Sequence, residues 1–283
     1  MNIKIVIDSA CDMSLADAEK SNIRIVPLKV FFGDKMYLDN VTLSHSEFYE
    51  KLIESTRLPT TSQITPYEFG QVFREETKAG NKIICITVSG KLSGTYQSAC
   101  LAAKDFENVA VVDSMNGSIG ERILADYAVS LINRGKSFEE IVETLNKEKN
   151  NIRLMAMLDT LEYLKKGGRI SSSVAFAGSL LAIKPVLAVK DGELYLHGKA
   201  RGSKAVNNKI AEYIHECGGI DFDKPFYLAY SGTSRDMLDK YIRDNKDLYQ
   251  DYADNIPVSS IGAAIGTHCG PGTIVAAFFA KTK

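Results

Sequence analysis

The stretch that decides the fold is ICITVSGKLSGTYQSACLAAK, residues 84–104. Its first residues are β-branched and apolar, as in a strand, and its last residues favour a helix. A short loop of Ser, Gly and Lys lies between them. A strand that leads into a helix through a glycine-rich turn is the repeating unit of an open α/β sheet.

The same alternation of strand and helix extends over the first half of the chain. The spacing of Ser or Thr three residues before Glu predicts helix starts at Ser44, Thr65 and Ser137, and apolar residues four apart predict a helix over 119–133. Apolar runs without polar alternation are typical of strands buried on both faces of a parallel sheet. These runs are residues 4–8, 23–32, 82–89 and 109–113.

The pattern changes after about residue 150. Asp191-Gly192, between two strand-like runs, is a strong hairpin signal, and a hairpin next to crossover connections predicts a mixed sheet. We therefore expect two α/β domains. Residues 1–154 form an open, mainly parallel sheet with flanking helices, and residues 155–283 form a mixed sheet with helices.

Charge and cysteine usage exclude several classes of protein. A net charge of -1 argues against nucleic acid or an anionic membrane as the main partner. The 5 cysteines contain no C-x-x-C pair, which disfavours a zinc site or a disulfide framework. The N-terminus is polar or charged by position 8, and the apolar run 174–189 is too short to cross a bilayer. These features predict a cytoplasmic protein without a metal.

Ser93 is the first candidate site residue. The run Gly90-Lys91-Leu92-Ser93-Gly94 is not the G-x-S-x-G elbow of a hydrolase, because its Ser is displaced by one position. Ser93 caps the following helix in the simplest interpretation. Alternatively its hydroxyl binds a carboxylate or phosphate at that helix N-terminus, where the helix dipole favours negative charge.

Three further segments offer groups that bind acids, and each also has a purely structural interpretation. Thr61 and Ser62 supply neutral hydroxyls in a loop, or are ordinary turn residues. His268 is expected in a glycine-rich loop, 265–273, where it has either a structural or a ligand role. Arg169 and Arg201 stand beside glycines, and each is either solvated or in contact with a phosphate or an acidic partner.

Eight segments, in their order along the chain, together resemble the DegV family, and in particular the fatty-acid-binding subunits (FakB) of bacterial fatty acid kinase. They are IVIDSACD, PTTSQ, SGKLSGTYQSA, VVDS, KKGGRIS, KPVL, ARG and GTHCGPG. Cys11 and Cys269 depart from the resemblance, since Thr or another small residue is commoner there.

This resemblance implies a protein that is not itself an enzyme and needs no cofactor. One long-chain fatty acid, such as palmitate or oleate, would lie between the two domains. Thr61 and Ser93 would hold its carboxyl group, with Ser62 and His268 nearby. A separate ATP-dependent kinase subunit would convert the presented carboxyl to acyl phosphate for phospholipid synthesis.

The resemblance also implies, less directly, that Arg169 and Arg201 contact the kinase or the acyl phosphate, and it allows a transient membrane contact. The energetics suit a fatty acid. Burying about fourteen methylenes at ~0.8 kcal/mol each gives roughly 11 kcal/mol. That exceeds the roughly 8 kcal/mol of a micromolar complex and leaves a margin for the cost of association.

Two other functions remain open from the sequence alone. One is a serine acyl hydrolase that uses Ser93 as nucleophile and His268 as base. The other is a site for a small sugar or ketone phosphate, since a similar α/β domain serves kinases of small ketones.

Overall fold

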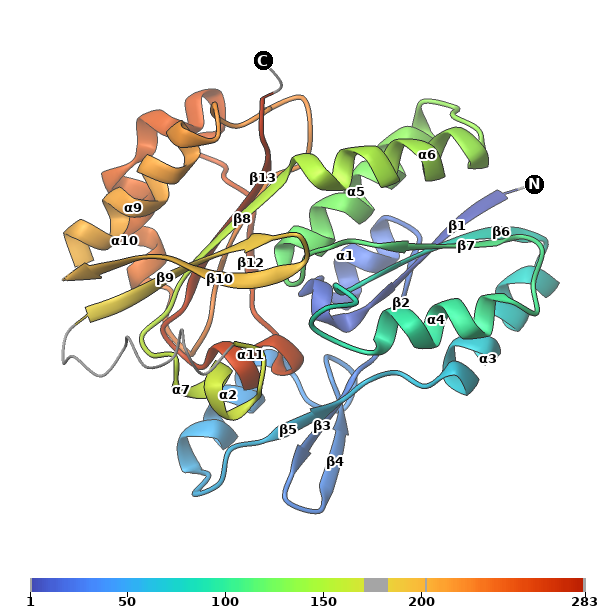
Figure 1. Ribbon diagram of the computed structural model, residues 1–283, viewed down its shortest axis with the longest axis horizontal. Coiled ribbons are helices and arrows are strands. Elements are labelled where there is room, and N and C mark those ends of the chain that lie inside the picture. The colour runs from blue at the N-terminus through green and yellow to red at the C-terminus, as the bar shows by residue number, and fades with distance from the viewer. Residues whose placement is uncertain (1, 171–182, 202, 282–283) are drawn as a thin grey trace.

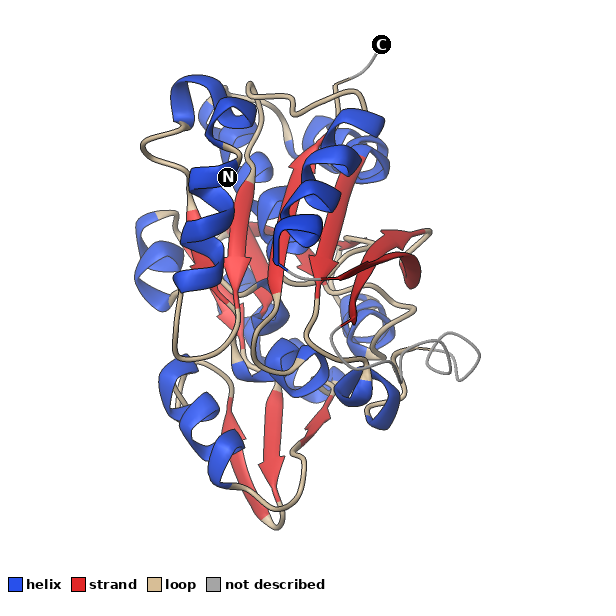
Figure 2. Ribbon diagram, turned by 90° about the vertical axis from the view of Figure 1, so that its left-hand side faces the viewer, coloured by secondary structure: helices blue, strands red, loops and turns tan. Residues whose placement is uncertain are grey.

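The computed structural model describes residues 2–170, 183–201 and 203–281. Its strands form a four-stranded, a six-stranded and a three-stranded sheet. Figure 1 shows the four-stranded sheet on the right, the six-stranded sheet on the left and the small sheet below. Figure 2 shows that the small sheet extends beyond the other two.

The four-stranded sheet is entirely parallel, in the order β2-β1-β6-β7. Its strands are β1 (Asn2–Asp8), β2 (Ile23–Val26), β6 (Asn81–Thr87) and β7 (Val109–Asp113). Both faces are covered, because side chains of one core cluster alternate along β1 and β6 with side chains of another. Helices α3 (Pro66–Lys78) and α4 (Thr95–Ala103) cover one face, and α5 (Ile119–Asn133) covers the other. The predicted parallel sheet is confirmed.

Helix starts in this half follow the sequence signals. Reciprocal capping boxes form at Ser44, Thr65 and Ser137, which begin α2 (His45–Glu54), α3 and α6 (Phe138–Glu148). Each box satisfies N–H groups that the first helical turn leaves unpaired. The predicted helix over 119–133 is α5. A short helix, α1 (Leu15–Lys20), begins at the cap Ser14.

The predicted single strand over residues 23–32 is wrong. It breaks at Pro27 into β2 and β3 (Lys29–Phe32), since proline has no N–H to donate to a strand ladder. β3 pairs antiparallel with β4 (Lys35–Leu38) and β5 (Thr60–Ser62). No pattern in the sequence predicted this third sheet, which carries Thr61 and Ser62 on β5.

The six-stranded sheet is mixed, as predicted, in the order β10-β9-β8-β13-β11-β12. Only β11 and β12 pair in parallel. The hairpin is confirmed, since Asp191 and Gly192 both take positive φ between β9 and β10. The strands are β8 (Ile152–Met157), β9 (Ile183–Lys190), β10 (Glu193–Arg201), β11 (Tyr227–Tyr230), β12 (Val258–Ser260) and β13 (Ile274–Phe279).

The remaining described elements are helices and turns, most of which connect or cover the strands of this sheet. They are the helices α7 (Glu162–Lys166), α9 (Ser203–Glu216), α10 (Asp236–Asp244) and α11 (Ala263–Cys269), and the 3-10 turns η1 (Ser9–Cys11), η2 (Lys149–Asn151) and η4 (Lys246–Tyr252). Of the helices in the described part of the chain, none combines the length and apolar composition needed to span a bilayer.

One hydrophobic core joins the two larger sheets. It contains Ile5 and Ile7 of β1, residues of α5, and Leu154 and Val275 of the six-stranded sheet. The expected domain boundary at residue 154 falls inside β8, which pairs along its whole length with β13. The two sheets therefore pack against one another through α5, and the cavity described next lies where they meet.

Candidate functional site

A cavity of about 360 Å³ lies between the two larger sheets. Strands β8, β9, β10 and β13 form one wall, and η1, the loops after β6 and β7, and α11 form the other. Most lining side chains are apolar. They include Leu28, Val88, Leu92, Leu154, Leu158, Leu164, Leu187, Val189, Leu194, Ile261, Ile265 and Val275.

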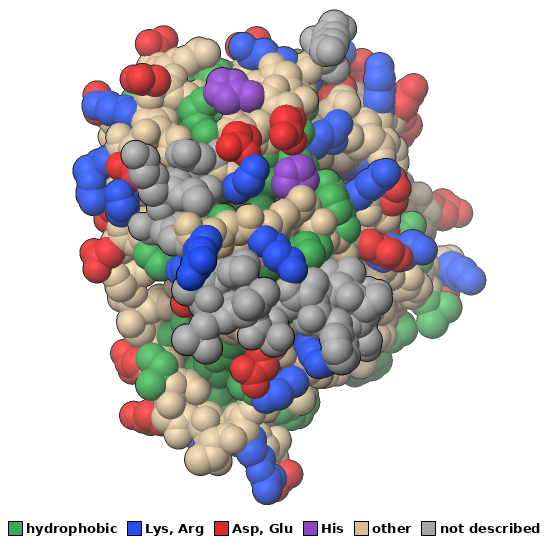
Figure 3. Space-filling view, turned by 60° about the vertical axis from the view of Figure 1, so that its left-hand side comes forward, with side chains coloured by type: hydrophobic (Ala, Val, Ile, Leu, Met, Phe, Trp, Pro, Cys, Tyr) green, Lys and Arg blue, Asp and Glu red, His purple; other side chains and the backbone are tan. Residues whose placement is uncertain are grey.

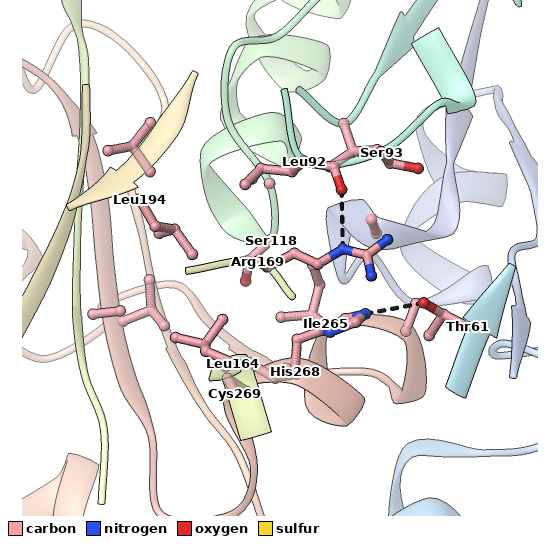
Figure 4. Close-up of a pocket in the computed structure, with 18 of the residues that line it drawn as sticks. Thr61, Leu92, Ser93, Ser118, Leu164, Arg169, Leu194, Ile265, His268 and Cys269 are labelled. Carbon is pink, nitrogen blue, oxygen red and sulfur yellow. Dashed lines mark hydrogen bonds between the residues drawn. The ribbon is translucent and has the colours of Figure 1, made fainter. Parts of the chain in front are cut away.

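Polar side chains gather toward one side of this cavity. Thr61, Ser93, Arg169 and His268 approach one another there, whereas Leu194 lies on the opposite side (Figure 4). Ser62 also lines the cavity. The structure thus brings the four predicted fatty-acid-binding residues, Thr61, Ser62, Ser93 and His268, from three separate segments to one cavity.

His268 is held by Thr61. Its Nε2 atom lies 2.9 Å from Thr61 Oγ1, within hydrogen-bond distance. Burial, reinforced by the positive charge of Arg169, lowers the pKa of His268 to about 4. The imidazole is therefore neutral at physiological pH, with one nitrogen as donor and the other as acceptor. Nδ1 has no hydrogen-bond partner among the described residues.

The predicted loop around His268 is wrong, because residues 263–269 form helix α11 and His268 lies in its last turn. Gly266 permits this helix, since a β-carbon there would approach Phe48 and Tyr49 of α2 to within 2.7 Å. Positive φ angles occur only after the helix, at Gly270 and Gly272. The glycines thus serve close helix packing and the turn that follows.

Ser93 does not occupy the cap position of α4, which begins after Gly94. Its Oγ instead shares a 2.9 Å hydrogen bond with Thr95 Oγ1 and accepts one from the Thr95 N–H at 3.3 Å. No hydrogen bond joins Ser93 to His268. With Nδ1 of His268 also lacking an acidic partner in the described chain, the arrangement does not support the hydrolase alternative.

Arg169 belongs to the cavity itself. It follows α7, and it donates from Nε to the Leu92 carbonyl at 3.2 Å and from Nη1 to the Gly167 carbonyl at 2.6 Å. No acidic side chain of the described residues forms an ion pair with it. Its charge is thus available to an anion in the cavity, close to the neutral hydroxyls. Arg201, by contrast, lies exposed on β10 and does not line the cavity.

Sequence reasoning missed Gln63 and Ser118 as lining residues. Gln63 belongs to the quoted PTTSQ segment, and its amide donates to Ser98 Oγ at 3.0 Å. That bond, and the close packing of Gln63 on Gly94, fix β5 against the loop that carries Ser93. No sequence motif marks Ser118 as a site residue, because only the folding of distant segments places it at the cavity.

The tip of the β9–β10 hairpin, which belongs to the six-stranded sheet, closes one side of the cavity. Ser89 Oγ donates to the Gly192 carbonyl at 2.7 Å, and Val189 and Leu194 line the cavity on either side of the turn. The loop after β6 therefore contacts the hairpin through Ser89 and presents Ser93 to the cavity.

This arrangement suits a long molecule with one acidic end. Hydroxyl groups, a neutral imidazole and one guanidinium can satisfy an acid group, and the apolar walls can cover a hydrocarbon. Among the described residues, no group of three or more His, Cys, Asp or Glu side chains is placed to hold a metal ion.

Known proteins share both this sequence and this architecture. A DegV domain-containing protein of Clostridium acetobutylicum is 41% identical over 218 residues, 76% of each chain. A structure described as fatty acid binding of a DegV family protein from Thermus thermophilus superposes with a TM-score of 0.87 at 33% identity, covering 99% of this chain and 100% of that one. A stearic acid-binding protein from Eubacterium ventriosum superposes with a TM-score of 0.84 at 29% identity over 98% of each chain. The family model described as "Uncharacterised protein, DegV family" matches residues 2–281, and the chain therefore belongs to the DegV family.

Proposed function

We propose that this protein binds one long-chain fatty acid, with the carboxyl group beside Thr61, Ser93 and His268 and the hydrocarbon along the apolar walls. The observation that carries the proposal is a cavity of about 360 Å³ with its polar groups gathered toward one side. The fatty-acid binding of the similar Thermus and Eubacterium proteins supports the same class of ligand.

The two ends of the ligand have different roles. Removing the hydrocarbon from water supplies most of the affinity, at about 0.8 kcal/mol per methylene. A carboxylate loses hydration on entry and needs hydrogen bonds in return. If Nε2 of His268 carries the proton and donates to Thr61 Oγ1, the Thr61 hydroxyl hydrogen is directed to the ligand. Ser93 donates a second hydrogen bond, and Arg169 offsets the negative charge.

The bound acid is a substrate for another protein. Neutral hydroxyl donors fix the carboxyl group without the tight grip of a bidentate arginine pair, which leaves an oxygen able to react. The sequence has neither the P-loop nor the dinucleotide-binding glycine pattern, which favours a separate ATP-dependent kinase subunit as the source of the phosphoryl group. The product is acyl phosphate for phospholipid synthesis in the cytoplasm. Exposed Arg201 suits docking of the kinase, and Arg169 suits contact with the acyl phosphate.

Lipid analysis of the purified protein tests the first step. Native mass spectrometry, followed by solvent extraction, should find one fatty acid per chain, and delipidated protein should rebind added palmitate or oleate. Protein that purifies without lipid and ignores added fatty acid would refute the proposal. Supplying a fatty acid kinase and ATP tests the second step, because acyl phosphate should form only when both proteins are present.

A further inference from the structure

The position of His268 depends on the start of helix α11, and that start is held from outside the helix. Gly262, the residue before α11, has no side chain to cap it. Its N–H donates to Asp12 Oδ1 at 2.8 Å, and the Ala263 N–H donates to Asp39 Oδ1 at 2.9 Å. Two carboxyl groups from the first 40 residues thus satisfy N–H groups that the helix itself leaves unpaired.

Each carboxyl group is fixed by a second hydrogen bond. Ser118 Oγ donates to Asp12 Oδ2 at 2.5 Å, and Ser9 Oγ donates to Asp39 Oδ2 at 2.8 Å. Ser9 Oγ also accepts from the Leu28 N–H at 3.0 Å. Asp12 is 2% exposed and Asp39 is 1% exposed, so neither can exchange these bonds for water. Because Ser118 and Leu28 line the cavity, the same bonds connect the cavity wall to the start of α11.

The fit at the start of α11 leaves no room for it to shift. A β-carbon on Gly262 would lie 3.2 Å from both Asp12 Oδ1 and Asp39 Oδ1, and 2.8 Å from His45 Nε2. Tyr49 Oη donates to the carbonyl of the preceding Ile261 at 3.1 Å. Figure 1 shows α11 packed beside α2 and α7, below the two larger sheets. A displacement at Gly262 would therefore move His268, at the far end of the same short helix.

We propose that Asp12 and Asp39 are positioning residues for the fatty acid carboxyl group, because they hold α11 where Nε2 of His268 reaches Thr61. The inference rests on the proposed function. Neither aspartate lines the cavity. Their effect on the ligand's carboxyl group passes through the position of His268 on α11.

A double-mutant cycle tests this dependence. We expect Asp39→Ala to weaken fatty acid binding about tenfold in the wild-type background, the size of one lost hydrogen bond. In a His268→Ala background the same change should alter the dissociation constant less than twofold, since the group that Asp39 positions is already absent. An equal loss of affinity in both backgrounds would overturn the proposal and show a general structural effect.

Three further variants sharpen the result. Asp39→Asn keeps an oxygen that accepts from the Ala263 N–H. Its dissociation constant for fatty acid should stay within about threefold of the wild-type value. Gly262→Ala leaves both carboxyl groups intact but displaces the helix start. It should weaken fatty acid binding in the wild-type background but not in the His268→Ala background, even where Asp39→Ala does not fold. Tyr249→Phe removes one member of the buried Tyr241–Tyr249 hydroxyl pair in a different core cluster. It should lower stability without changing affinity in either background.

A spectroscopic measurement separates this proposal from the proposed function. The imidazole nitrogen resonances of ligand-free protein report the hydrogen bond between His268 and Thr61 directly. They should shift in Asp39→Ala and Gly262→Ala but not in Tyr249→Phe. If wild type binds no fatty acid but these shifts occur, the fatty acid function fails and the positioning stands. Unchanged resonances in folded Asp39→Ala and Gly262→Ala overturn the positioning whatever the ligand.

Discussion

The imidazole of His268 lies directly against Gly167, so that a β-carbon at position 167 would overlap its Nδ1 atom. Gly167 has right-handed helical backbone angles that any residue adopts. Position 167 therefore requires glycine because there is no room for a side chain, and not because of its backbone conformation. With Gly167 on one side and Thr61 on the other, the ring has a single position.

Gly167→Ala should expel the ring from this position. We expect loss of the bond to Thr61 and a roughly five- to tenfold weaker fatty acid complex, equivalent to about 1 kcal/mol. Gly70→Ala is a matched control, because a β-carbon there meets no atom within 4 Å. A Gly167→Ala protein that binds fatty acid as tightly as wild type would show that the ring position does not matter.

Removing the hydroxyls should weaken the head-group contacts without affecting the apolar walls. Thr61→Ala and Ser93→Ala are each expected to cost about 1–2 kcal/mol of binding free energy by titration with a labelled fatty acid. Ser62→Ala is the comparison, since Ser62 Oγ has only a 3.4 Å contact with the Gln63 carbonyl. With the kinase supplied, full acyl phosphate production by the Thr61→Ala, Ser93→Ala double variant would exclude a role for these hydroxyls.

The depressed pKa of His268 predicts how its contribution to stability depends on pH. The folded protein holds this pKa at about 4, against 6.5 for the free side chain. Between these values the unfolded chain binds a proton that the folded protein does not, so acidification favours unfolding. As the pH falls from 6.5 to 4, wild type should lose on the order of 3 kcal/mol relative to His268→Gln. Denaturant titrations at several pH values measure this, and parallel profiles would contradict it.

The buried carboxyl of Asp12 predicts a pH dependence of the opposite sign. Burial raises the pKa of Asp12 from 3.8 to about 8. Its contribution to stability is complete below pH 3.8 and is lost as the pH rises through about 8, because the unfolded chain releases the proton first. Asp12→Asn should therefore flatten the decline in unfolding free energy between pH 4 and 8. An equally steep decline in that variant would assign the effect to other groups.

The contact between the β9–β10 hairpin and the loop after β6 suggests a way to lock the cavity. A β-carbon at position 192 would lie 3.8 Å from the Lys91 β-carbon, a separation that suits a disulfide, although it would also crowd Ser89 Oγ. In the Ser89→Ala, Lys91→Cys, Gly192→Cys protein we expect oxidation to slow fatty acid exchange at least tenfold. Reduction of the same protein is the control, with oxidised wild type to account for the native cysteines. Equal fatty acid exchange rates in the oxidised and reduced protein would show that the ligand does not enter or leave between the hairpin and the loop after β6.

Local signals in the sequence predicted local structure well. The three capping boxes and the Asp191-Gly192 turn depend on residues close together in the chain, whose spacing sets their hydrogen bonds. Predictions that depended on distant packing were less successful. Pro27 divided a strand so that its second half joined another sheet. Gly266 lies inside a helix, where the close packing of α2 leaves no room for a side chain.

The sequence by itself determined the α/β class, the positions of most helices and strands, and the kinds of polar group available. Only the tertiary structure decided that Thr61 and His268, 207 residues apart, share a hydrogen bond beside the Arg169 charge. The physical reason is that element formation follows short-range hydrogen bonding and apolar periodicity. The meeting of three segments at one cavity instead depends on how two sheets and α11 bury their apolar faces together.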